Sequence, residues 1–197
     1  MLIDIADTSV NKKHLDILIR LDYFDMFGNS GYLLKLYDEF QNGEFKYKKT
    51  YVDQTKAKRL EELRKMEIEL SKDNDLKLLP NEIIMFQKEL LGYCELTYPN
   101  MDLSWCVVTE IDTKYSPKLT LYNLNKGAEK VFKMSKKLFN TRNKETQIVV
   151  GDLIQLLGHK NEFKKVPDGN GNFVATDQKE QWITEYKKYI IKENENE

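Results

Sequence analysis

The chain has 197 residues, of which 41% are hydrophobic and 32% are charged, and its formal net charge is −1. This length suits one large or two small domains. The near-neutral charge excludes a protein whose whole surface attracts nucleic acid, so any such site must be a local patch. Two cysteines, Cys94 and Cys106, do not make a disulfide scaffold, and without a CxxC motif we expect no structural zinc.

The first ten residues, MLIDIADTSV, carry acids where a signal peptide needs a basic region and an apolar core. No run in the chain approaches the length of about 18 apolar residues that spans a bilayer. We therefore expect a cytoplasmic protein without a membrane partner.

Apolar residues recur with helical periodicity along the N-terminal half. They predict helices at residues 11–21, 30–39, 54–71 and 81–93. Gly28 and Asn29 tolerate positive φ, so we place the turn between the first two helices there. The third predicted helix interleaves Glu and Lys at helical spacings, which favours a solvated connecting helix.

The C-terminal half is rich in β-branched and aromatic residues with period-two alternation, which is typical of strands. The strand-like runs are residues 104–112, 117–124, 131–139, 146–166 and 181–191. The third run also fits a short helix, and the last fits a helix as well as the closing strand that we favour. Short strands at near-regular spacing predict a closed or part-closed barrel, or a sandwich.

Other motifs give no site. Asp73 and Asp75 could pair at a metal, but they lie in a polar break that favours a solvated loop. Residues 168–172, DGNGN, lack the later Gly and Glu of a calcium loop, and we read them as a hairpin turn. His14 and His159 have no partner at catalytic spacing. We therefore expect no catalytic residue, no metal and no cofactor.

Basic residues crowd two segments that have few acids between them. One set is Lys126, Lys130, Lys133, Lys136, Lys137, Arg142 and Lys144, and the other is His159, Lys160, Lys164 and Lys165. The interleaved rings are Trp105, Tyr122, Phe132, Phe139 and Phe163. A cationic groove with stacking rings binds single strands. The alternative, which composition alone favours, has the rings in the core and the lysines in solvent.

Two stretches and the strand-rich region resemble bacterial DNA polymerase III alpha subunits of the DnaE type. Residues 11–34 resemble the second helix–hairpin–helix element, at Asn11, Lys12, Leu15, Leu18, Ile19, Phe24, Asp25, Gly28, Leu33 and Leu34. Residues 88–99 resemble the Glu-x-Leu-Gly-x-Tyr-x-x-x-His-Pro segment at Glu89, Leu91, Gly92 and Pro99. The strand-rich region then occupies the place of the family's OB-fold, a five-stranded barrel taken to bind single-stranded template.

The chain also departs from that family. Asp22 and Tyr23 replace small hairpin residues, and a carboxylate there would oppose a phosphate. Tyr98 stands where the family has His. The sequence also lacks four other parts of that family: the first helix–hairpin–helix element, the palm with its catalytic aspartates, the histidinol-phosphatase-like domain and a clear clamp-binding peptide. The resemblance therefore implies a C-terminal piece, or a shortened relative, of a DNA-directed DNA polymerase, which should not polymerise alone.

Together these observations predict an α+β protein with a helical region at residues 1–100, a five-stranded OB-like β-barrel at 101–192 and a frayed tail at 193–197. The resemblance implies a role in DNA replication, holding single-stranded template and contacting other replication proteins, with duplex DNA a further candidate. The expected phosphate contacts are Lys133, Lys136, Lys137, Arg142, Lys160 and Lys164, with Lys12 and Lys13 in the first helix. The expected stacking rings are Trp105, Tyr122 and Phe132. The alternative function is an interaction module that binds other replication proteins and no DNA.

Overall fold

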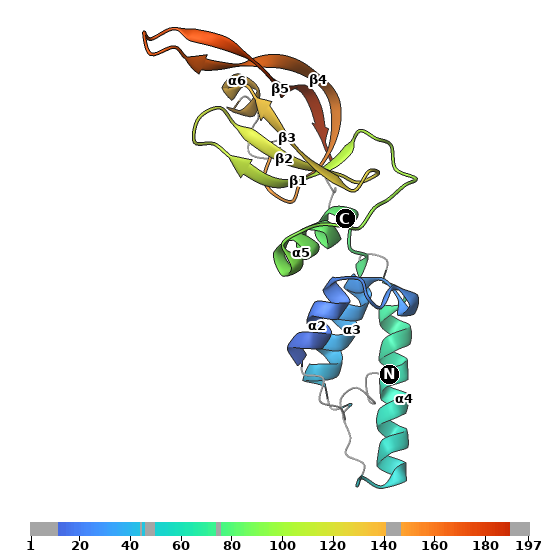
Figure 1. Ribbon diagram of the computed structural model, residues 1–197. Helices are drawn as coiled ribbons and strands as arrows, with labels where there is room; N and C mark the ends of the chain where they lie inside the picture. The colour runs from blue at the N-terminus through green and yellow to red at the C-terminus, as the bar shows by residue number, and fades with distance from the viewer. Residues whose placement is uncertain (1–11, 44, 46–49, 74–75, 141–146, 190–197) are drawn as a thin grey trace. The chain divides into compact units, whose positions relative to one another are not determined.

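The computed structural model describes residues 12–43, 45, 50–73, 76–140 and 147–189. The chain divides into two compact units, residues 1–91 and 92–197. Among the described residues, helices dominate the first unit and a five-stranded sheet dominates the second, which confirms the α+β class (Figure 1). The boundary falls earlier than the one expected after residue 100. Residues before that point already bond to the sheet, since the Tyr98 N–H donates to the Leu124 carbonyl over 2.7 Å.

The described part of the N-terminal unit contains four α-helices, close to the predicted ranges. They are α2 (Lys12–Arg20), α3 (Ser30–Asn42), α4 (Asp53–Leu70) and α5 (Pro80–Leu91). A short 3-10 turn, η1 (Asp25–Phe27), lies between α2 and α3. Of the residues in α4, only Leu63 is buried, and Lys65 and Glu61 form an ion pair of 2.7 Å on its surface. The prediction of a solvated helix is therefore confirmed.

One apolar cluster holds α2, α3 and α4 together, because each helix places its apolar stripe on the same side. Its buried members are Leu15, Ile19, Leu33, Leu36, Tyr37, Phe40 and Leu63. The tight connection of α2 to α3 has its positive φ at Asp22 (62°) and Gly28 (141°). Asn29 instead has extended backbone and caps α3, since its side chain accepts a hydrogen bond from the Gly31 N–H. The turn was thus placed correctly, but Asn29 acts in it as a cap.

The described part of the C-terminal unit has five strands and one short helix. They are β1 (Trp105–Asp112), β2 (Lys118–Asn123), β3 (Ala128–Met134), α6 (Lys136–Asn140), β4 (Leu153–Pro167) and β5 (Phe173–Lys188). Neighbouring strands follow the order β1-β2-β3-β5-β4, and β4 pairs again with β1, so the pairing closes on itself. The β3–β5 pairing is parallel, and the others are antiparallel.

Three predicted runs change in extent. The run 146–166 becomes a strand, β4, only from Leu153 onward. The run 131–139 holds the end of β3 and the start of α6, so both of its interpretations are partly right. The run 181–191 is the end of a longer strand that starts at Phe173, which confirms strand over helix as far as Lys188. The turn predicted at 168–172 does join β4 to β5, where the Asp168 side chain accepts hydrogen bonds from the Asn170 and Asn172 N–H groups.

Strands β4 and β5 extend beyond the other strands as a long hairpin (Figure 1). Their register shifts on either side of Gly158, where a Cβ would lie 2.6 Å from the Thr184 hydroxyl. Register shifts of this kind mark a bulge, which bends a strand, so we place a bend of β4 at Gly158. The core inside the ring includes Val108, Leu119, Met134 and Ile154.

Candidate nucleic-acid interface

Two of the three expected stacking rings are buried, so these predictions are wrong. Tyr122 is 1% exposed and Phe132 is 6% exposed. Phe132 lies in the core inside the ring, opposite Leu119 in the β2–β3 register, and its ring meets His159 edge-on at 5.8 Å. Neither ring can stack on a base without unfolding part of the unit.

Tyr122 is buried because residues before β1 cover it. Its hydroxyl donates a hydrogen bond of 2.8 Å to the Leu96 carbonyl. Burial, with smaller effects of Cys94 and Glu129, raises the pKa of Tyr122 to about 12. The residue therefore fixes the covering segment to β2, which is a structural role.

The third expected ring, Trp105, is half-buried at the start of β1. Its indole meets the Tyr189 ring edge-on, with 6.2 Å between the centroids. Both residues lie where β1, β4 and the end of β5 run together, since Trp105 pairs with Gln155 and the Tyr189 N–H donates to Leu153. This aromatic pair is separate from the lysine cluster described below.

The residues expected to contact phosphate do not gather in one place. Lys160 pairs with Glu162 at 2.6 Å, and Lys164 donates to the Gln178 side chain at 3.3 Å. Lys136 and Lys137 are exposed on α6. Arg142 lies outside the described residues. Lys12 and Lys13 are exposed on α2, in the other unit.

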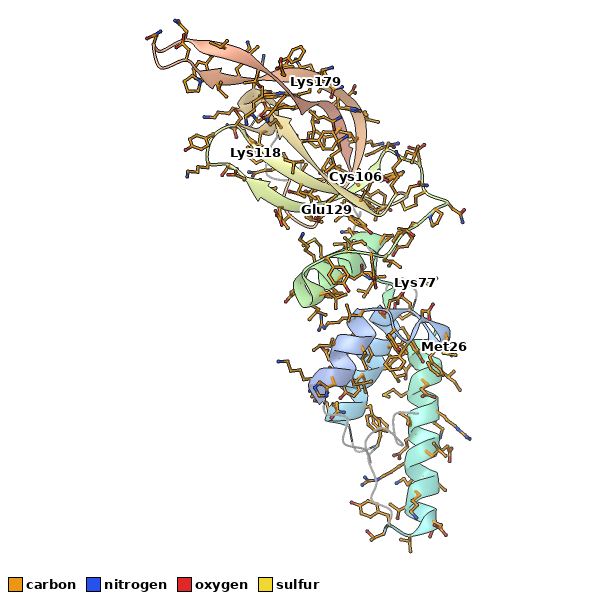
Figure 2. All side chains as sticks on the ribbon, in the orientation of Figure 1. Met26, Lys77, Cys106, Lys118, Glu129 and Lys179 are labelled. Carbon is orange, nitrogen blue, oxygen red and sulfur yellow. The ribbon has the colours of Figure 1, made fainter. Side chains whose placement is uncertain are left out.

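The structure instead brings lysines from three strands around one open hollow of about 400 Å³. Its lining residues are Lys118 from β2, Lys130, Val131 and Lys133 from β3, and Lys179, Glu180 and Gln181 from β5. The register explains the gathering, because Lys118 stands opposite Lys133 and Lys133 stands opposite Trp182. Figure 2 labels Lys118 on β2 and Lys179 on β5. We call this set the lysine hollow.

The lysine hollow has an excess of positive charge, with four ammonium groups against one carboxylate. Glu180 pairs with Lys133 at 2.7 Å, and Lys118 pairs with Asp112, outside the lining, at 3.5 Å. Among the described residues, no carboxylate forms an ion pair with Lys130 or Lys179. These two ammonium groups are therefore the best placed to receive an anion.

Aromatic rings stand beside the cations of the lysine hollow. The Lys133 ammonium lies 5.5 Å from the Trp182 ring, and the Lys179 ammonium lies 5.6 Å from the Phe163 ring. Phe163 is exposed and pairs with Lys179 in the β4–β5 register, whereas Trp182 is half-buried. Phe163 therefore offers an exposed ring beside an ammonium group that forms no ion pair with a described carboxylate.

Sequence reasoning missed Lys118 and Lys179, and it did not choose Phe163 from the ring set. Lys179 fell between the predicted turn and the predicted last strand, because β5 starts at Phe173. The register of the β2–β3 hairpin could have found the Lys118–Lys133 pair, since the short turn after Asn123 sets these two lysines opposite each other. The parallel pairing of β3 with β5 joins residues far apart in sequence, and no local pattern signals it.

The described residues hold no group of three or more His, Cys, Asp or Glu side chains that could bind a metal. Over the same residues, no helix is both long and apolar enough to cross a bilayer. The chain matches no family model, no curated protein and no solved structure.

Proposed function

We propose that the C-terminal unit is an OB-like barrel that binds single-stranded DNA in the lysine hollow. By its resemblance to polymerase III alpha subunits of the DnaE type, the chain would act in cytoplasmic DNA replication and hold template strand. The order β1-β2-β3-β5-β4 with β4 returning to β1 supports the first part, because an OB-fold is a five-stranded Greek-key barrel whose face binds oligonucleotides.

The lysine hollow is the observation that carries this proposal. Phosphates attract ammonium groups without regard to sequence, and bases stack on exposed rings at about 1–3 kcal/mol per base. Lys130 and Lys179 supply the phosphate contacts, and Phe163 supplies the ring. We therefore assign base stacking to the exposed Phe163 in place of the buried Tyr122 and Phe132.

The second candidate is an interaction module that binds other replication proteins and no DNA. This candidate is favoured by the ion pairs that neutralise several lysines of the C-terminal unit. Lys160, Lys188 and Lys118 each pair with a carboxylate, of Glu162, Asp152 and Asp112 respectively. Lysines neutralised in this way attract phosphate less strongly than unpaired ones. A pull-down of replication proteins that persists after nuclease treatment, from a chain that binds no oligonucleotide, would support this candidate.

Titration of a labelled oligothymidine at several salt concentrations tests the proposal. Each phosphate contact to a single strand contributes about −0.7 to the slope of log K against log salt. The double variant Lys130→Gln/Lys179→Gln should therefore make the slope shallower by about 1.4. The matched control is Lys72→Gln/Lys187→Gln, which removes the same charge from exposed lysines outside the hollow. Absent or salt-insensitive binding, or equal slopes for both double variants, would rule the proposal out.

A further inference from the structure

The loop between α2 and α3 exposes three large apolar side chains within five residues. Tyr23 is 72% exposed, Met26 is 80% exposed and Phe27 is 53% exposed. Isolated apolar residues on a surface need no explanation, but a contiguous group marks an interaction site. Aromatic residues and Met are also the types enriched at the centres of protein interfaces. We call this group the apolar loop.

The apolar loop is held firmly at its base. The Ser30 hydroxyl lies 2.7 Å from the Ile19 carbonyl and 2.6 Å from the Asp22 carboxylate, and Ser30 is buried. Asp22 keeps a φ of 62°, which costs free energy for a residue with a side chain. The Phe27 N–H donates to the Phe24 carbonyl, and the Phe24 ring packs on the helical core. The fold therefore presents the exposed side chains in a fixed arrangement.

Charge identifies the kind of partner. The only charged residues between Leu21 and Gly31 are Asp22 and Asp25, and Asp25 is exposed. Carboxylates repel the phosphates of nucleic acid and of anionic lipid, whereas they attract Lys and Arg. An apolar surface beside acids fits a protein segment whose apolar side chains are flanked by basic ones.

We propose that the apolar loop docks a basic amphipathic segment of another protein. The proposal is independent of the lysine hollow, because it rests on side chains of the N-terminal unit alone. Apolar anchors of the partner would cover Tyr23, Met26 and Phe27, and its basic residues would lie against Asp25 and Asp22. The flexible thioether of Met26 would let the surface adapt to anchors of different shape.

Fluorescence anisotropy tests this proposal by measuring the binding of a labelled helical peptide. The peptide carries a stripe of leucines on one face and lysines on the other. The variant Tyr23→Ser/Met26→Ser/Phe27→Ser should weaken its binding by about a hundredfold, since it removes all three apolar side chains at the centre of the interface. Asp25→Lys should weaken it by about threefold. The matched control is Val52→Ser/Ile68→Ser/Leu91→Ser, which removes exposed apolar residues elsewhere in this unit and should leave binding unchanged.

Two further peptides separate a docking site from simple charge attraction. A scrambled peptide of equal charge, and one with glutamate in place of lysine, should both bind weakly. Equal binding of the striped and scrambled peptides, or equal binding to wild type and the Ser variant, would overturn the proposal. So would a dimer in sedimentation that the Ser variant abolishes, because the loop would then bind a second copy. Circular dichroism of every variant verifies folding, and Met26→Leu should retain binding even if the Ser variant unfolds.

Discussion

The Lys133 ammonium lies 2.7 Å from the Glu180 carboxylate, and this ion pair joins β3 to β5 in the lining of the lysine hollow. Both side chains are largely removed from water, with 23% and 20% of their surfaces exposed. A phosphate entering the hollow would have to compete with Glu180 for Lys133. The carboxylate therefore limits how tightly an anion can bind there.

We predict that Glu180→Gln strengthens oligonucleotide binding. The change removes the one negative charge of the lining and releases Lys133, which should raise affinity by about threefold to fivefold at low salt. Lys133→Gln should weaken binding, since it leaves Glu180 without its cation. Anisotropy with the same oligothymidine measures both. Glu162→Gln is the matched control, because it frees Lys160 outside the hollow. Weaker binding by Glu180→Gln would contradict a phosphate site at this position.

Phe163 gives a second prediction, which separates stacking from charge. Phe163→Ala should weaken oligonucleotide binding by about 1–3 kcal/mol while the salt slope stays as in the wild type, because a stacked ring releases no counterion. Tyr23→Ala removes an exposed ring from the other unit and should leave oligonucleotide binding unchanged. If Phe163→Ala binds as the wild type does, the ring beside Lys179 has no part in the site.

The helices could be predicted from the sequence because their apolar stripes are local. Leu15 and Ile19 lie four residues apart, and both are buried on one face of α2. The burial of Tyr122 could not be read from β2 alone. Its outward face is covered by a loop around Leu96 that local patterns assign to the helical half.

The candidate site shows the same limit. Lys130 and Lys133 are close in sequence, and both appear in the predicted basic set. Lys179 joins them only through the parallel β3–β5 pairing, which brings together residues about fifty positions apart. The sequence composition thus predicts an excess of positive charge in this part of the chain. The strand order, which composition does not predict, gathers that charge into the lysine hollow.

Tyr122 gives a third prediction, on stability against pH. Its pKa is raised from 10.0 in the unfolded reference to about 12 in the folded chain. Above pH 10 the unfolded chain releases this proton first and binds fewer protons than the folded chain. The contribution to stability is therefore complete below pH 10 and is lost as pH rises toward 12, by about 2–3 kcal/mol in total.

Tyr122→Phe tests this assignment in urea unfolding across the alkaline range. Near neutral pH the variant should be less stable by about 1 kcal/mol, because the Leu96 carbonyl loses its donor. The difference should shrink and then reverse as pH rises past 10, since phenylalanine has no proton to release. Tyr115→Phe, at an exposed ring, is the control. A constant difference between Tyr122→Phe and the wild type at all pH values would show that the hydroxyl is not buried in solution.

Asn29 gives the last prediction, on how the N-terminal unit is held together. Its side-chain oxygen accepts hydrogen bonds of 2.9 Å from the Gly31 N–H at the start of α3 and from the Leu78 N–H before α5. The two segments approach so closely that a Cβ on Gly31 would overlap the Leu76 carbonyl oxygen. One side chain therefore caps a helix and fixes a distant segment to it.

Asn29→Ala should lower the free energy of unfolding of this unit by about 2 kcal/mol, which combines a lost cap with a second unpaired N–H. Asn29→Asp keeps an acceptor in the same place and adds a charge that the helix N-terminus favours, so it should stay near wild type. Far-UV circular dichroism follows the helices, whereas tryptophan fluorescence follows the other unit, because Trp105 and Trp182 both lie there. We expect the midpoint of the helical unfolding transition to fall while the midpoint of the fluorescence transition stays unchanged. A fluorescence midpoint that falls together with the helical one would mean that the cap stabilises more than its own unit.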